Sequence, residues 1–234
     1  ALHHGGQFQQ VAQGAAKLVA VVDAAAEDQL TVDRDPALHQ TGQILQYFSA
    51  PLVGQHPDAE LVAICDKFVP ALEKAGKAAE EAGLKIALYE NFEDFFKHDM
   101  DAVVLANYAN EHATFAIRLL RSGRHVLSEV LPCETMAQAV ELIEAVEESG
   151  KVYAYAENYC YMWHAFEMRE RYERGEIGDV MYAEGEYIHD CSAIWPSITY
   201  GERDHWRNNM FPTFYCTHSI GPMLTITGHR PVQV

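Results

Sequence analysis

The side chains best suited to acid–base chemistry lie near the end of the chain, around His218. The run from Tyr215 to Ser219, followed by Gly221 and Pro222, is poor composition for a hydrophobic core. Because histidine changes charge near neutral pH, it can act as a general base. His218 is therefore the first candidate for a catalytic residue, and a buried structural histidine is the alternative.

Metal chemistry is not expected. The sequence contains 12 histidines and five cysteines but no HxxxH, HExxH or CxxC spacing, and these are the spacings typical of zinc sites. The odd number and wide separation of the cysteines favour reduced thiols over disulfides. We therefore expect a cytoplasmic protein.

The charge balance excludes several classes of partner. Lys and Arg total 17 against 34 Asp and Glu, which gives a formal net charge of −17. Nucleic acids and anionic lipids both attract clustered basic residues, so neither is an expected partner. No apolar run approaches the roughly 20 residues that span a bilayer.

Strands and helices alternate along the middle of the chain, which indicates βαβ units and a parallel sheet. Helix ends carry their usual signals, with Asn91 and Thr135 as expected N-caps. The expected strands are 61–65, 85–89, 102–106, 125–129 and 152–157, and the expected helices are 71–81, 92–98, 112–122 and 135–149.

The regular alternation of strand and helix patterns ends after residue 158. We expect a charged helix over 163–174, an alternating strand over 180–188, an irregular stretch over 191–213 and a helix from 217. The predicted organisation is an uncertain segment over 1–56, a dinucleotide-binding domain over 57–158, and the beginning of a substrate domain over 159–234.

The first 56 residues give a weaker signal. The run KLVAVVD at 17–23 nearly repeats ELVAICD at 60–66, so it is a candidate first strand, with 39–48 as a candidate helix. No GxGxxG loop follows any strand, although glycine lets the backbone approach a pyrophosphate. Either the true first strand and its loop are absent from this chain, or cofactor binding is impaired. We favour absence, because the chain begins with alanine.

From about residue 58 to 234 the order of motifs resembles the Gfo/Idh/MocA family of sugar and inositol oxidoreductases. The resemblance implies a Rossmann-type parallel sheet followed by an α/β domain with an open sheet. The motifs that carry it are a strand ending in Asp66, the run from Asp101 to Asn107 and on to His112, GRHVLSE at 123–129, RGEIG at 174–178, and His218 ten residues before Gly228.

Departures from the family pattern point to one branch. Val130 stands where the family has its catalytic lysine, Phe214 stands four residues before the histidine in place of Asp, and Gly221 stands three residues after it in place of Asp. With these departures the sequence resembles one branch of that family, glycoside hydrolase family 109 and its relatives. Its matching runs are Glu129-Val130, ENYCY at 157–161, EGEYIHD at 184–190, Trp206-Arg207 and YCTHSIGP at 215–222.

That branch implies an NAD-dependent enzyme that takes a hydride from C3 of a sugar. His218 would be the base, Tyr161 or Tyr215 would relay or donate a proton, and Arg207 would hold a hydroxyl or an enolate. Tyr187 and Glu129 are the expected substrate contacts. The expected cofactor-binding residues are Asp66, Asn107, His112, Glu129, Val130 and Asn158.

The Asp66 carboxylate favours NAD, because it would accept from both ribose hydroxyls and repel the phosphate of NADP. Less specific roles remain for several residues: Asp66 as a helix cap, His112 as a first-turn helix residue, Tyr187 as an ordinary strand aromatic and Arg207 as a partner of Asp204.

Three functions stay open on the sequence. The first is a redox-elimination glycosidase, the second an ordinary sugar C3 dehydrogenase, and the third a non-catalytic sugar- or nucleotide-binding scaffold. A homo-oligomer is expected, since the family's open sheet commonly pairs with another protomer.

Overall fold

The computed structural model describes residues 16–22, 59–199 and 201–233. The chain divides into two compact units, Ala1–Ala154 and Tyr155–Val234. The division falls close to the boundary expected near residue 158, and the role of each unit remains a prediction.

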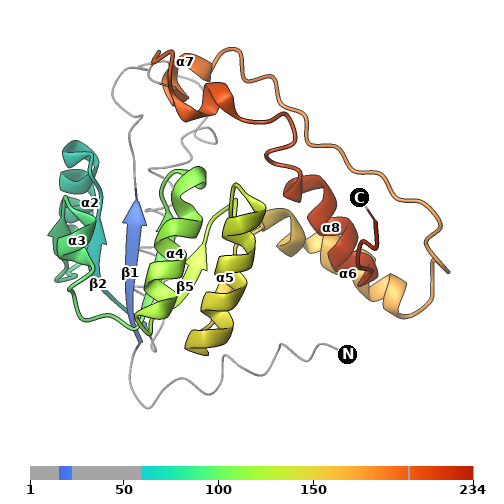
Figure 1. Cartoon of the computed structure of the whole chain (residues 1–234), viewed down its shortest axis with the longest axis horizontal. Helices are drawn as coiled ribbons and strands as arrows, with labels where there is room; N and C mark the ends of the chain where they lie inside the picture. The colour runs from blue at the N-terminus through green and yellow to red at the C-terminus, as the bar shows by residue number, and fades with distance from the viewer. Residues whose placement is uncertain (1–15, 23–58, 200, 234) are drawn as a thin grey trace. The chain divides into compact units, whose positions relative to one another are not determined.

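The first unit is built on a six-stranded sheet in the order β3-β2-β1-β4-β5-β6 (Figure 1). This is the strand order of doubly wound dinucleotide-binding folds, so the predicted Rossmann-type α/β class is confirmed. The strands are β1 (Ala16–Val22), β2 (Ala59–Cys65), β3 (Ala87–Tyr89), β4 (Ala102–Ala106), β5 (His125–Ser128) and β6 (Tyr153–Tyr155).

The first strand of the sheet is present in this chain. β1 lies between β2 and β4 and pairs in parallel with both, so the expectation that the true first strand is absent was wrong. Its sequence is apolar from residue 18 to residue 22, as is typical of a central strand in a doubly wound sheet. The residues that follow β1, where a glycine-rich loop would lie, and the expected helix at 39–48 are outside the described residues.

Two helices of this unit begin at the predicted N-caps. The helix expected over 92–98 ends earlier, at Phe95, and the helix expected over 71–81 begins earlier, at Val69. Asn91 accepts a hydrogen bond from the backbone N–H of Glu93, and Thr135 forms a capping box with Gln138. Gly150 ends its helix in the left-handed conformation, with φ of 62°. The helices are α2 (Val69–Glu81), α3 (Phe92–Phe95), η4 (Ala109–Glu111), α4 (His112–Arg121) and α5 (Met136–Ser149).

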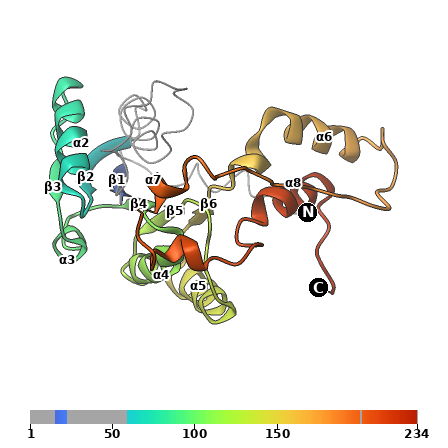
Figure 2. The same ribbon diagram turned by 90° about the horizontal axis from the view of Figure 1, so that it is seen from above.

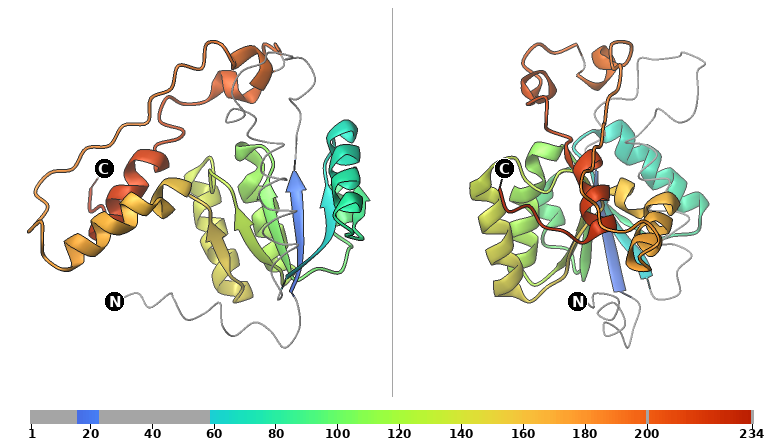
Figure 3. Two further views of the ribbon diagram at one scale, coloured as in Figure 1. Left: turned by 180° about the vertical axis from the view of Figure 1, so that it is seen from behind. Right: turned by 90° about the vertical axis from the view of Figure 1, so that its right-hand side faces the viewer.

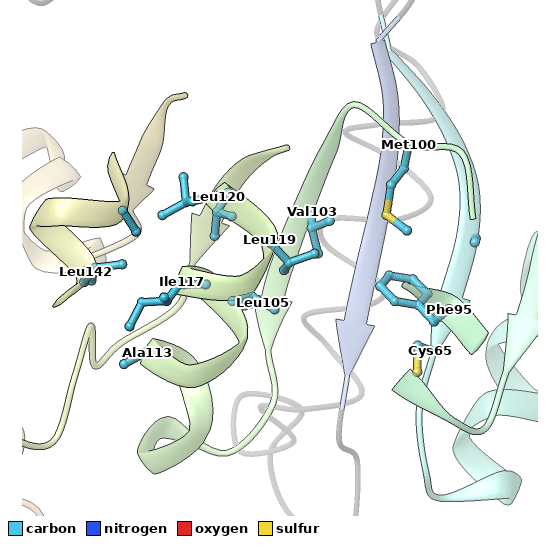
Figure 4. Close-up of a cluster of buried hydrophobic side chains, with 14 residues drawn as sticks. Cys65, Phe95, Met100, Val103, Leu105, Ala113, Ile117, Leu119, Leu120 and Leu142 are labelled. Carbon is cyan, nitrogen blue, oxygen red and sulfur yellow. The ribbon is translucent and has the colours of Figure 1, made fainter. Parts of the chain in front are cut away.

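Helices cover both faces of the sheet. On one face Val103 and Leu105 of β4 pack with residues of α3, α4 and α5 (Figure 4). On the other face Val104 packs with Leu72 of α2. Figure 2 shows α4 and α5 side by side, as their contacts require. Burial on both faces explains why β4 is apolar along its whole length.

The second unit is helical where it is regular. Helices α6 and α8 pack against each other (Figure 3), and α8 ends at Gly228 in the left-handed conformation. None of the helices among the described residues is both long enough and apolar enough to cross a bilayer. The helices are η5 (Asn158–Tyr161), α6 (Trp163–Glu173), α7 (Trp195–Ile198), η6 (Trp206–Asn209) and α8 (Thr217–Thr227).

The strand expected over 180–188 does not form. The segment is drawn out but has no strand hydrogen bonds, and its apolar side chains Met181 and Ile188 are exposed. A strand is stabilised by its neighbours, and no strand among the described residues pairs with this segment. The alternating pattern was therefore not sufficient to make it a strand.

Candidate functional site

Two polar residues flank the carboxyl end of β1 in the first unit. Cys65 of β2 pairs with Val21, and Ala106 of β4 pairs with Val22. The residues that follow, Asp66 and Asn107, are both buried. The carboxyl edge of a parallel sheet is where doubly wound folds bind ligands, so these two residues stand at the expected edge.

The side chains of Asp66 and Asn107 present oxygen acceptors at this edge. Asp66 Oδ1 accepts from the backbone N–H of Phe68 at 2.8 Å. Phe68 is the N-cap of α2 and has no side-chain cap, so Asp66 precedes the helix without capping it. Asn107 donates through Nδ2 to Glu111 at 3.2 Å, while its Oδ1 has no hydrogen-bond partner among the described residues. A buried acceptor without a partner fits a site completed by a ligand with hydroxyl donors.

His112 links the loop after β4 to the loop after β5. Its Nδ1 lies 2.8 Å from the carbonyl oxygen of Leu131, and its Nε2 lies 3.0 Å from that of Asn107. Burial lowers the pKa of His112, and nearby backbone carbonyls offset part of that effect. Both ring nitrogens face the backbone, so the histidine holds the loop after β5 against the loop after β4.

Glu129 and Val130 lie in the loop that His112 holds. The backbone N–H of Glu129 donates to Leu105 at 2.8 Å, and Glu129 Oε2 accepts from the backbone N–H of Val130 at 3.0 Å. The carboxylate is thus turned back on its own loop. The acceptors of Asp66, Asn107 and Glu129 fit the ribose hydroxyls of a dinucleotide, which are hydrogen-bond donors.

The second unit contains a buried histidine–carboxylate pair. His218 Nδ1 lies 2.6 Å from Glu157 Oε1, and the two side chains are only 6% and 4% exposed. Glu157 Oε1 also accepts from the backbone N–H of Tyr159 at 3.2 Å. With Nδ1 occupied, Nε2 is the ring nitrogen of His218 that remains for chemistry.

Three tyrosines surround the His218 ring. The ring centroid of Tyr187 lies 4.3 Å away, that of Tyr159 lies 4.9 Å away, and that of Tyr215 lies 5.6 Å away in a nearly parallel stack. Burial raises the pKa of Tyr187 to about 12, with smaller contributions from the neighbouring tyrosines, Cys191 and Glu157. Its phenol therefore stays protonated, as a hydrogen-bond donor must.

Arg207 joins the cluster through Tyr215. Its Nη1 donates to the Tyr215 hydroxyl at 3.3 Å, and its guanidinium lies 4.6 Å from the ring centroid of Trp206. Arginine commonly stacks on aromatic rings in this way while keeping other donors available. The sequence pair Trp206-Arg207 thus forms one structural feature.

The structure brings together His218, Tyr187, Tyr215 and Arg207, but it does not bring Tyr161 to them. Tyr161 is 63% exposed, and its ring packs at 6.3 Å from that of Phe166. Asn158 is also exposed, within η5.

Sequence reasoning missed Glu157 and Tyr159. Both lie in the ENYCY run that the resemblance had already selected, so the motif was the available signal. It could not say which tyrosine reaches His218, because η5 is a single 3₁₀ turn that sends successive side chains in different directions.

Among the described residues, no group of three or more His, Cys, Asp and Glu side chains could hold a metal ion.

Comparison with known sequences gives one family. Residues 40–157 match the Gfo/Idh/MocA family, described as an oxidoreductase family with an NAD-binding Rossmann fold. A relative named glycosyl hydrolase family 109 protein 1, from Bacteroides thetaiotaomicron, is 30% identical over 181 residues. That match covers 74% of this chain and 39% of the relative, so the chain spans well under half the length of this relative.

Solved structures show the same fold at lower identity. Myo-inositol 2-dehydrogenase from Lactobacillus plantarum aligns with a TM-score of 0.67 at 16% identity, over 93% of this chain and 58% of that one. The WlbA dehydrogenase from Bordetella pertussis, solved with NADH and UDP-GlcNAcA, aligns with a TM-score of 0.53 at 22% identity. This second match covers 70% of this chain and 43% of that one.

Proposed function

Because the chain belongs to the Gfo/Idh/MocA family of oxidoreductases, we propose that it acts on a sugar or glycoside with NAD, using redox elimination to cleave a glycosidic bond. The observation that carries the proposal is the buried His218–Glu157 pair inside its ring of tyrosines. The similarity to family 109 glycosyl hydrolases supports the glycosidase over an ordinary dehydrogenase.

The chain's residues would divide the proton transfers among them. A bound nicotinamide supplies hydride acceptance and return. With the nicotinamide bound, His218 Nε2 would take the proton of the C3 hydroxyl, so that loss of the C3 hydride would give a C3 ketone. The ketone would acidify C2–H, so loss of that proton would expel the C1 leaving group. A tyrosine hydroxyl would relay the C2 proton to the departing oxygen.

The reverse steps restore the redox state. Water would add its oxygen to C1 and a proton to C2, and His218 Nε2 would give its proton back to the C3 oxygen when the hydride is returned to C3. The balance is therefore glycoside plus water giving sugar plus alcohol. Arg207, fixed beside Tyr215, suits an enolate or hydroxyl oxygen on the substrate.

Residues of the first unit suit the cofactor. Asp66 would accept from the ribose hydroxyls and disfavour the phosphate of NADP, while Asn107 Oδ1 offers a buried acceptor. The proposed cofactor is therefore NAD.

One assay separates the candidate functions. The full-length protein is incubated with a p-nitrophenyl glycoside in D₂O, without added NAD. Release of nitrophenol without net NADH, and with deuterium at C2 of the sugar, is the expected result. Stoichiometric NADH would identify a C3 dehydrogenase instead. If the purified protein carries no NAD and also fails to bind added NAD in calorimetry, only the non-catalytic scaffold remains.

A further inference from the structure

We infer that Glu157 is a positioning residue that fixes which ring nitrogen of His218 carries the proton. A carboxylate can only accept a hydrogen bond, so the 2.6 Å contact requires the proton on Nδ1. A neutral imidazole has one N–H, and Nε2 is then left with its lone pair. The inference rests on the proposed function only where it treats Nε2 as the catalytic base.

The carboxylate is held where it is by the local backbone. Glu157 is the N-cap of η5, and the same oxygen that faces His218 accepts the Tyr159 N–H at 3.2 Å. The Glu157 side chain is almost fully buried. Movement away from His218 would therefore leave a buried donor without its acceptor, which costs free energy.

Gly221 leaves the space that Glu157 uses. A Cβ added at residue 221 would lie 2.9 Å from Cys160 Sγ and 3.2 Å from Glu157 Cγ. Residue 221 follows His218 by three positions in α8, so both lie on one helix face. A side chain at 221 would press on the glutamate that contacts the histidine.

This arrangement accounts for one of two departures in the sequence, the one at Gly221. The positions four before and three after the histidine, where the family pattern has Asp, are Phe214 and Gly221 here. The histidine nevertheless has a carboxylate partner, supplied by Glu157 from a different part of the chain. Because Gly221 has no side chain, the Glu157 side chain has room beside it.

Nitrogen NMR tests the inference without relying on turnover. The full-length protein is labelled with ¹⁵N-histidine, and long-range ¹H–¹⁵N spectra are recorded at a pH where the ring is neutral. The His218 signals are assigned by their loss in His218→Gln. The expected wild-type spectrum has a protonated Nδ1 and a bare Nε2, and a proton on Nε2 would overturn the inference without any further variant.

Two variants and a control sharpen the test. Glu157→Ala and Gly221→Val are both expected to move the proton toward Nε2, the form that unconstrained histidine side chains favour. Glu186→Ala removes an exposed carboxylate from the same unit and is expected to leave the spectrum unchanged. Retention of the wild-type tautomer in folded Glu157→Ala would contradict the positioning role.

Kinetics then separates this inference from the proposed function. Glu157→Ala is expected to lower kcat by about 10²-fold or more with little change in KM, because it removes the correct form of the base rather than a substrate contact. If the tautomer changes while kcat does not, His218 is not the base, and the positioning by Glu157 still stands.

Discussion

Gly185 packs directly against the backbone of Ser219, and this contact brings the segment that contains Tyr187 onto α8. An added Cβ at residue 185 would lie 2.8 Å from the carbonyl oxygen of Ser219. Tyr187, two residues later, then lies with its ring centroid 4.3 Å from that of His218. The close approach of one glycine to a helix thus sets one wall of the candidate site.

Substitution of Gly185 by valine should separate that segment from α8. The new side chain overlaps a backbone carbonyl that cannot move alone, so we expect a loss of about 1–3 kcal/mol in the free energy of unfolding. With Tyr187 displaced, KM for the glycoside should rise. Urea unfolding and steady-state kinetics measure both effects. Met181→Ala, at a side chain 91% exposed in the same segment, is the control and should change neither.

The two tyrosines of η5 make a matched pair. Tyr159 lies with its ring centroid 4.9 Å from that of His218, whereas Tyr161 is exposed. We expect Tyr159→Phe to lower kcat by at least about tenfold, because the variant loses a proton donor. Tyr161→Phe should leave kcat nearly unchanged. Equal losses in both variants, or a loss in Tyr161→Phe alone, would contradict this assignment.

Removal of the charge at Asp66 should relax cofactor choice. Asp66→Asn keeps an oxygen for the Phe68 N–H but removes the repulsion of a ribose phosphate. We expect the NAD affinity to fall about tenfold, equivalent to ~1.4 kcal/mol, while the NADP affinity rises. Calorimetric titration with each cofactor checks this. An unchanged ratio of the two affinities would show that Asp66 does not select NAD.

The buried His112 should make stability depend on pH. Its pKa is lowered in the folded state, so the unfolded chain, with a histidine pKa of about 6.5, binds the proton first as pH falls. The stabilising contribution is therefore complete above about pH 6.5 and is lost as pH falls toward the lower folded pKa. The free energy of unfolding should decrease from pH 7.5 to 5.5.

The variant His112→Gln isolates that contribution. Its urea unfolding free energy should vary less with pH over the same range than that of the wild type, although it is destabilised at pH 7.5 through loss of the contacts to Leu131 and Asn107. His189→Gln, at an exposed histidine, should preserve the wild-type slope. Parallel slopes in all three proteins would remove His112 as the source.

Much of the first unit was predictable because its signals are local. The strand over 102–106 and the caps at Asn91 and Thr135 form as expected, since continuous apolar runs and side-chain caps depend on near neighbours in the sequence. The strand over 180–188 was predicted from a pattern of the same kind and did not form. It lacks a pairing partner among the described residues, and a partner is not a local property.

The sequence by itself determined the family and the order of elements from residue 59 to 149, and it selected His218 as a candidate. These features follow from residue types and their spacing along the chain, which do not depend on contacts between distant residues. Only the tertiary structure decided that Glu157 is the partner of His218, that Tyr159 rather than Tyr161 lies beside it, and that Gly221 leaves room for the pair. Residues 157 and 218 meet only when α8 packs against η5, so folding, not spacing, creates the contact that defines the site.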